Sequence, residues 1–195
     1  MENIGITREG AMQLVDRYIT DPVTRLHLRE SEEVMRALAR HFGEDEDVWG
    51  IAGLLHDIDW DQTKNEPAQH CVMCQEILRD AGATEFLITT IISHGYANAS
   101  IPALTDQKRT TRIQHSLAAA ETVTGLVIAS ALMQPDKKLA SVSAKSLKKK
   151  FKTKSFAARC DRAIIKECED AGIPLDEFLT LSLTALQGIG DELGM

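Results

Sequence analysis

Apolar residues recur every three to four positions along most of this chain, and no stretch of useful length alternates apolar and polar residues. The first pattern puts apolar side chains on one face of an α-helix, whereas a half-buried strand requires alternation. We therefore predict an all-α fold, a helical bundle. Caps, glycines and prolines divide it into helices near residues 7–19, 23–43, 45–57, 65–82, 84–94 and 108–133. Beyond these, we predict a helix capped by Ser155 and ended by Gly172, and a last helix after Pro174.

The composition suits one cytoplasmic domain. With 195 residues, 44% of them hydrophobic, the chain can bury a core of its own, so we predict a single domain, 1–195. The amino terminus lacks a basic region followed by an apolar run, and no window approaches the roughly 20 apolar residues of a membrane span. The four cysteines are too sparse for a disulfide scaffold and are expected to be reduced thiols. The formal net charge of -7 disfavours membrane surfaces and general nucleic-acid binding.

The doublet His56-Asp57 is the strongest functional signal. It closes an apolar helical stretch, Gly53-Leu54-Leu55, so its imidazole and carboxylate are expected to be buried. A buried charge is costly unless it is paired or coordinates a metal. We therefore predict that a metal ion lies beside the doublet. The alternative is a side-chain hydrogen bond at a helix end, which needs no ion.

Further inward-facing polar residues supply candidate ligands. His27, His70 and His94 each share a helical face with apolar residues. Glu121 lies in the middle of the apolar stripe of the longest predicted helix, and glutamate is rarely buried without a partner. Taken singly, a histidine on an apolar face is more often a hydrogen-bonded core residue than a ligand. Together with the doublet, these residues form a set of imidazoles and carboxylates that suits Fe, Mn, Zn, Ni or Co better than Ca²⁺.

The remaining histidines, cysteines and basic residues carry weaker signals. His41 and His115 are expected to be structural or exposed. Cys71 and Cys74 have the spacing of half a zinc site, but the second pair of cysteines is separated by seven residues, which disfavours that interpretation. A lysine-rich run, 145–154, is ordinarily a solvated face. The basic residues that could bind a substrate phosphate are Lys64, Arg109, Arg112, Lys149 and Lys150.

The order His27, His56-Asp57, Glu121 resembles that of the HD superfamily of metal-dependent phosphohydrolases. Its most specific stretch here is Gly53-Leu54-Leu55-His56-Asp57-Ile58-Asp59, and residues 119–126 resemble the segment that brings the closing acid. The resemblance covers about residues 20–130 and implies an HD-domain-like bundle with the metal at its centre, followed by a C-terminal helical extension at about 136–195. His70 and His94 are similar to the ligands of the second ion in the two-metal branch. Two positions depart from the pattern, because Glu121 stands where an aspartate is usual and Gly95 follows His94 where a second histidine is frequent.

The resemblance implies catalysis with one or two divalent transition-metal ions. In this hypothesis His27, His56, Asp57 and Glu121 hold one ion, His70 and His94 hold the other, and Asp57 bridges the two. With His56 and Asp57 at the catalytic centre, a metal-activated hydroxide would hydrolyse a phosphomonoester or a phosphodiester, nucleotides being among the candidates. The expected partner is a small phosphorylated substrate, and a homodimer is a further expectation.

Two other functions remain open at this point. Some members of the superfamily use a di-iron pair for oxidation, so an oxygenase of the same fold is one alternative. The other is a non-catalytic helical binding or regulatory module whose metal site has degenerated. The glutamate at position 121 is the feature that favours this second alternative.

Overall fold

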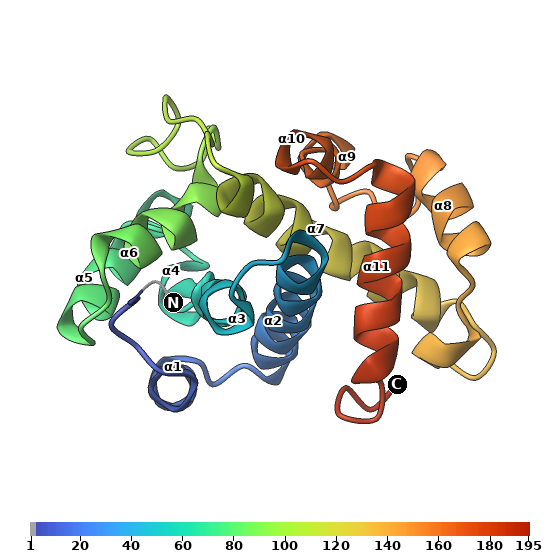
Figure 1. Cartoon of the computed structure of the whole chain (residues 1–195), viewed down its shortest axis with the longest axis horizontal. Helices are drawn as coiled ribbons and strands as arrows, with labels where there is room; N and C mark the ends of the chain where they lie inside the picture. Colours follow the sequence, from blue (N-terminus) through green and yellow to red (C-terminus); the bar gives the residue numbers. More distant parts are fainter. Residues whose placement is uncertain (1–2) are drawn as a thin grey trace.

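The computed structural model describes residues 3–195, which form α-helices and short 3-10 helices joined by loops (Figure 1). These residues contain no β-strand, so the all-α prediction is confirmed. The first part comprises α1 (Arg8–Tyr18), α2 (Pro22–Phe42), α3 (Glu46–Leu55), α4 (Trp60–Thr63), α5 (Met73–Asp80) and α6 (Glu85–Ile92), with 3-10 helices η1 (Pro67–Gln69) and η2 (Ser93–Gly95). The second part comprises α7 (Arg112–Leu132), η3 (Leu139–Ser141), α8 (Ala144–Lys152), α9 (Arg162–Lys166), α10 (Cys168–Ala171) and α11 (Leu175–Gly188).

The ends of α2 and α3 follow from local chemistry. The Asp21 side chain accepts a hydrogen bond from the backbone N–H of Val23, and Pro22 occupies the first turn, where no intrahelical donor is needed. At the other end Gly43 adopts a left-handed conformation, φ 71°, which a residue without Cβ reaches without strain. Asp45 then caps α3. The predictions near 23–43 and 45–57 are therefore confirmed to within a few residues.

The predicted continuous helix at 65–82 is wrong. The chain forms η1, leaves the helical conformation at His70 (φ -60°, ψ 140°) and takes a positive φ of 61° at Cys71 before α5 begins. The short helix α4 was not predicted. The break places His70 on a bend between two helices rather than on a helical face, so the face that we assigned to it does not exist.

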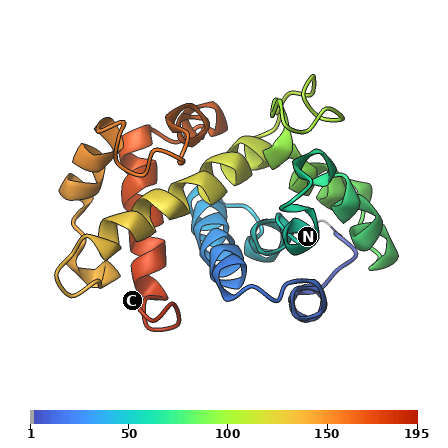
Figure 2. The same cartoon turned by 180° about the vertical axis from the view of Figure 1, so that it is seen from behind.

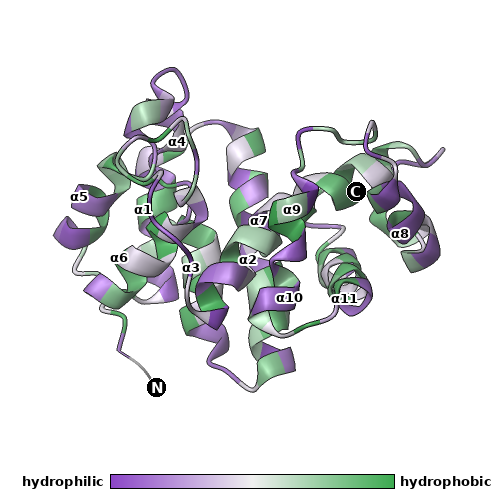
Figure 3. Cartoon of the chain, turned by 90° about the horizontal axis from the view of Figure 1, so that it is seen from above, coloured by the Kyte–Doolittle hydropathy of each residue, from purple (hydrophilic) through white to green (hydrophobic). Residues whose placement is uncertain are grey.

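Two details of the second part also differ from the prediction. The helix predicted near 108–133 begins at Arg112 rather than near residue 108, because Thr111 and Gln114 form a capping box there. Ser155 caps no helix: residues 154–159 are turns, and the next helix, α9, is capped by Asp161. The lysine-rich run, for which no helix was predicted, is largely helix α8, much of which is hydrophilic in Figure 3.

Helix α7 is the centre of the molecule. It runs diagonally from the side where α3 and α6 lie to the side where α8 and α11 lie, as both views show (Figures 1 and 2). Helix α2 packs against α7, α3 and α11. One hydrophobic cluster joins the two parts, since it includes Leu28 of α2, Leu117 of α7 and Phe178 of α11. The extension therefore shares its core with the amino-terminal helices.

Helix α7 is an exception to the expectation that no segment is apolar enough to span a membrane. By length and composition it is apolar enough to cross a membrane, with a mean hydropathy of 1.3 over its best 18-residue window. However, 61% of that window is buried inside the structure. A core helix of this kind passes the same test, so the finding is weak evidence for a membrane span.

Helices α2 and α3 approach closely because of a glycine. A Cβ atom on Gly53 would lie 2.6 Å from the backbone oxygen of Ser31 and 2.9 Å from the backbone nitrogen of Glu32. Only hydrogen fits in this space. The close approach holds α2, which carries His27 in its second turn, next to the end of α3, where His56 and Asp57 follow.

Candidate metal centre

Four imidazoles and one carboxylate lie close together between the helices of the first part. His27 comes from α2, His56 and Asp57 follow α3, His70 lies between η1 and α5, and His94 belongs to η2. Their side chains are buried or nearly so, except that of His27, which is 28% exposed. The structure thus brings together five of the six ligands that the sequence suggested.

The Nε2 atoms of the imidazoles surround the Asp57 carboxylate. Asp57 Oδ1 lies 3.2 Å from Nε2 of His94, 3.4 Å from that of His70 and 3.6 Å from that of His56. Asp57 Oδ2 lies 4.0 Å from Nε2 of His27. Between imidazoles, the Nε2 atoms of His27 and His56 are 3.1 Å apart, as are those of His70 and His94.

Each imidazole uses its other nitrogen, Nδ1, to donate a hydrogen bond away from the centre. The acceptors are the Gly53 carbonyl for His56 (2.8 Å), the Ile91 carbonyl for His94 (2.7 Å) and the Asp59 carboxylate for His70 (2.9 Å). His27 Nδ1 lies 3.1 Å from the Thr124 hydroxyl, which donates its own proton to the Glu121 carbonyl and can therefore only accept from the imidazole. Outer partners of this kind fix the tautomer of metal-binding histidines.

This donor pattern calls for positive charge at the centre. With Nδ1 protonated, each neutral imidazole directs an Nε2 lone pair inward, and two lone pairs at 3.1 Å repel unless a proton or a cation lies between them. The residues fit divalent transition metals, which favour imidazole nitrogen and carboxylate oxygen. Two groups have ligand atoms close enough to share an ion: His27, His56 and Asp57, and His70, Cys71 and His94. Asp57 belongs to the first group, and its Oδ1 also lies 3.4 Å from Nε2 of His70 and 3.2 Å from Nε2 of His94 in the second.

The pKa values of these groups also indicate that the centre needs positive charge. Burial lowers the pKa of His56 to about 3, which leaves its imidazole neutral at physiological pH. Burial also acts against protonation of His70, but the hydrogen bonds to Asp59 and Cys71 and the charge of Asp57 together outweigh it and raise the pKa of His70 to about 10. The surrounding imidazoles overcome the effect of burial on Asp57 and hold its pKa well below the usual range. Without an ion, protons supply the positive charge that the carboxylate requires.

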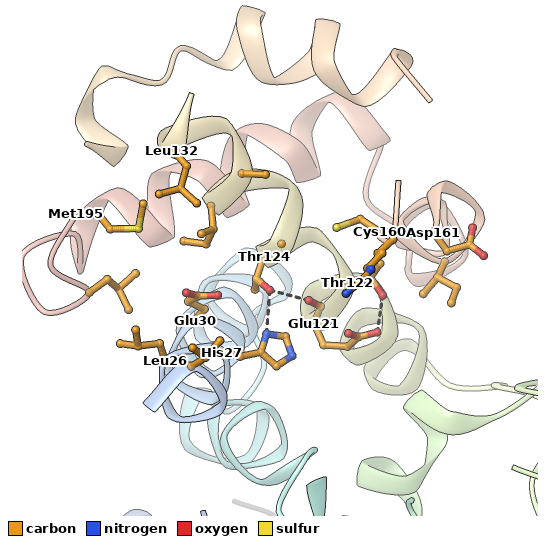
Figure 4. A pocket seen from close by; sticks show the side chains of 17 residues that line it. Leu26, His27, Glu30, Glu121, Thr122, Thr124, Leu132, Cys160, Asp161 and Met195 are labelled. Carbon is orange, nitrogen blue, oxygen red and sulfur yellow. Dashed lines mark hydrogen bonds between the residues drawn. The ribbon is translucent and has the colours of Figure 1, made fainter. Parts of the chain in front are cut away.

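Glu121 lies beside the first group but outside it. Its carboxylate accepts a hydrogen bond from the hydroxyl of Thr122, its neighbour on α7, instead of joining the atoms around Asp57 (Figure 4). Burial raises the pKa of Glu121. Figure 4 shows the side chain next to the imidazole of His27, so Glu121 is near the position predicted for it, but its carboxylate is directed elsewhere.

The basic residues suggested for substrate binding are not part of this cluster. Arg109 pairs with Glu167 and donates to three backbone carbonyls, two in η2 and one at Tyr96. Arg112 lies 3.3 Å from Glu44, and Lys64 lies 3.7 Å from Asp61. Lys150 donates to the carbonyl of Ser130 on α7, and Lys149 is exposed on α8. Their role toward a substrate stays a prediction.

His41 and His115 also stand apart from the centre. His41 lies 3.6 Å from Glu177, and His115 lies 2.8 Å from the Glu167 carboxylate. Both imidazoles are partly buried and pair with an acid of the C-terminal extension, so both have structural contacts there.

Sequence reasoning did not identify Asp59 or Cys71 as part of the site. Asp59 is completely buried, and its two oxygens accept from His70 Nδ1 and from the backbone N–H of Cys74, at 2.9 and 3.0 Å. The Cys71 sulfur lies 3.4 Å from His94 Nε2. The signal for Asp59 was present in the sequence, since a second acid two residues after the doublet lies in the same apolar stretch.

Comparison with protein families agrees with this geometry. The model of the family described as HD domain matches residues 24–97, a segment that begins in α2 and ends just after η2. Residues 24–97 therefore match an HD domain. The segment contains the four central histidines and Asp57, whereas Glu121 lies beyond its end. Members of the HD superfamily are mostly metal-dependent hydrolases. Searches among curated proteins and among solved structures gave no match to the chain.

Proposed function

We propose that this HD domain hydrolyses a phosphomonoester or a phosphodiester with the help of one or two divalent transition-metal ions. The observation that carries the proposal is the convergence of four Nε2 atoms on Asp57, each imidazole held by a hydrogen bond from Nδ1. In this proposal His27, His56 and Asp57 hold one ion and His70 and His94 hold the other. When bound, such ions polarise a phosphoryl group and lower the pKa of water.

The protein contributes the orientation of these ligands. Asp57 lies between the two groups, where its two oxygens can serve both. Asp59 and Thr124 fix the tautomers of His70 and His27, and the carbonyls of Gly53 and Ile91 fix those of His56 and His94. No ligand needs to change its tautomer on binding, so the centre is preorganised.

A cleft of about 640 Å³ next to His27 is the place we propose for the rest of the substrate. His27 and Glu121 lie at its inner end, and α2, α7, residues 159–164 and residues 193–195 form its walls (Figure 4). About half of the lining side chains are apolar, such as Leu26, Ile128 and Leu132, and none of the described residues that line it is phenylalanine, tyrosine or tryptophan. Because bases are commonly held by aromatic stacking, this lining favours an aliphatic alcohol over a nucleoside as the leaving group.

The orientation of Glu121 favours a second candidate. Since its carboxylate is bonded to Thr122 and not directed at Asp57, the first group has three protein ligands and lacks a closing acid. A binding or regulatory module with a weakened metal site would have this appearance. The first group could equally use three ligands and leave positions open for water and substrate, as catalytic metal sites do.

Metal content and activity distinguish the two candidates. Protein purified without chelator is analysed for metals and assayed with added Mn²⁺, Ni²⁺ or Fe²⁺ against aryl phosphates, nucleotides and alkyl phosphates. We expect bound transition metal and phosphatase activity that His56→Ala lowers by more than about 100-fold, because it removes a ligand. His115→Ala, which removes an imidazole outside the cluster, is the matched control.

The outcomes separate the alternatives. Bound metal without hydrolysis, but with iron-dependent oxygen consumption, would point to an oxygenase. Absence of both metal and hydrolysis would support the binding module and remove the catalytic proposal. A preference for alkyl phosphates over nucleotides would support the role assigned to the cleft.

A further inference from the structure

Cys71 has the position of a ligand in the second group. Its side chain is completely buried, and its sulfur lies 3.4 Å from Nε2 and 3.9 Å from Nδ1 of His94. The Nε2 atom of His94 is in turn 3.1 Å from that of His70. The sulfur and the two imidazole nitrogens therefore lie within reach of one ion.

The backbone at Cys71 is bent in a way that an ordinary core cysteine does not need. Its φ of 61° lies in the left-handed region, which costs a residue with a Cβ about 1–2 kcal/mol. Strain of this kind persists where the surrounding structure demands it, frequently at functional sites. Here the bend ends η1 and directs both His70 and Cys71 toward the centre.

Gly95 provides the space for the thiol. A Cβ atom at residue 95 would lie 2.7 Å from the Cys71 sulfur and 3.1 Å from Ile101. A side chain at position 95 and the thiol at position 71 thus exclude each other. The chain combines the smallest residue at 95 with a sulfur ligand at 71.

Cys74 provides the contrast within the same segment. It is equally buried, but no hydrogen bond or metal-ligand grouping among the described residues includes its sulfur. Only its backbone N–H faces the site, where it donates to Asp59. Of the two cysteines, therefore, only Cys71 presents sulfur to the imidazoles.

We propose that Cys71 binds the second metal ion as a thiolate, together with His70 and His94. As the sulfur–metal bond forms, the thiol proton is released to solvent, so binding at this site releases a proton. A thiolate among imidazoles favours softer ions, Zn²⁺, Co²⁺ or Fe²⁺, over Mg²⁺ and Mn²⁺. The inference rests on the metal binding in the proposed function but not on the hydrolytic reaction.

Cobalt spectroscopy tests this directly. The full chain is stripped of metal and titrated with Co²⁺, and the near-ultraviolet absorption is followed for a sulfur-to-cobalt charge-transfer band. We expect the band in the parent protein and in Cys74→Ser, and its loss in Cys71→Ser. We also expect the Zn²⁺ affinity of Cys71→Ser to be at least about 10-fold lower, measured by competition with a chelating dye.

A second measurement covers the case in which Cys71→Ser does not fold. X-ray absorption of the Zn²⁺-loaded parent protein and of Cys74→Ser should show a sulfur neighbour at about 2.3 Å in both. Visible cobalt bands without a charge-transfer band, or zinc with only nitrogen and oxygen neighbours, would overturn the inference even if phosphatase activity is present. A sulfur neighbour in a protein without phosphatase activity would support the inference and contradict the proposed reaction.

Discussion

Replacement of Asp59 by asparagine should weaken either the fold or the second metal group, depending on which donor the amide oxygen faces. The two Asp59 oxygens accept from two donors, His70 Nδ1 and the backbone N–H of Cys74. Asparagine has only one oxygen, so its NH₂ group must face one of these donors. Because the side chain is completely buried, water cannot replace the lost acceptor.

Each of the two possible arrangements has a calculable effect. If the amide oxygen faces His70, the N–H of Cys74 is left unpaired, which lowers the free energy of unfolding by about 1–3 kcal/mol. If the NH₂ group faces His70, the imidazole must accept at Nδ1 and carry its proton on Nε2, where it blocks metal coordination. Loss of such an outer partner lowers metal affinity by about 10–100-fold.

Two assays and one control variant decide the matter. Metal affinity is measured by competition with a chelating dye, and the free energy of unfolding by urea denaturation of the metal-free protein. Asp61→Asn is the control, because Asp61 also accepts from backbone donors, those of Thr20 and Asp21, but lies outside the metal cluster. Because these donors share one oxygen, Oδ2, which asparagine can replace, we expect Asp61→Asn to change stability less than Asp59→Asn and to leave metal affinity unchanged. If Asp59→Asn matches the parent protein in both metal affinity and free energy of unfolding, the role assigned to Asp59 is wrong.

Two further predictions concern helix α2. Gly53→Ala should lower the free energy of unfolding by about 1–3 kcal/mol in urea denaturation, because the new Cβ would collide with the backbone of Ser31 and force α2 away from α3. At an open helix position, the same substitution would raise the free energy of unfolding. An unchanged or higher stability would refute this. The Glu32 side chain is completely buried among arginines, which outweigh the effect of burial and lower the pKa of its carboxyl. Its ion pairs should therefore stabilise the fold above about pH 4.5, and this stabilisation should be lost as the pH falls through the folded-state pKa. Glu32→Gln should therefore cost about 3 kcal/mol at neutral pH, and the difference from the parent protein should shrink in acid; a constant difference would contradict the reasoning.

The helices could be predicted from the sequence wherever local chemistry decides them. The caps and stop signals around α2 and α3 act within a few residues, so the pattern of Asp21, Gly43 and Asp45 was sufficient. The break at His70 and Cys71 could not be found in this way. Its cause lies in contacts to Asp59 and His94, and the periodicity of the surrounding residues continues across it.

The residues of the candidate metal centre were likewise predictable from the sequence only in part. The histidines and Asp57 were identifiable by type, because few partners other than a metal suit so many buried imidazoles around a carboxylate. His70 lies with the other imidazoles beside Asp57, although the helical face predicted for it does not exist. The partners of Arg109 were not predictable, since Glu167 is 58 positions away along the chain. The direction of the Glu121 carboxylate depends on a rotamer, which no sequence pattern specifies.

The walls of the cleft beside His27 come from distant parts of the chain, and this has a consequence for how such a protein can diversify. The residues around Asp57 all lie within 24–97, but most of the cleft is built from α7, residues 159–164 and residues 193–195. Under the proposed function, mutations in α7 and in the last third can therefore reshape the substrate-binding cleft while the proposed ion-binding atoms keep their places. On that proposal, reactivity and selectivity are encoded largely in separate stretches, and exchange of the residues from α7 onward between related chains is a practical route to altered selectivity.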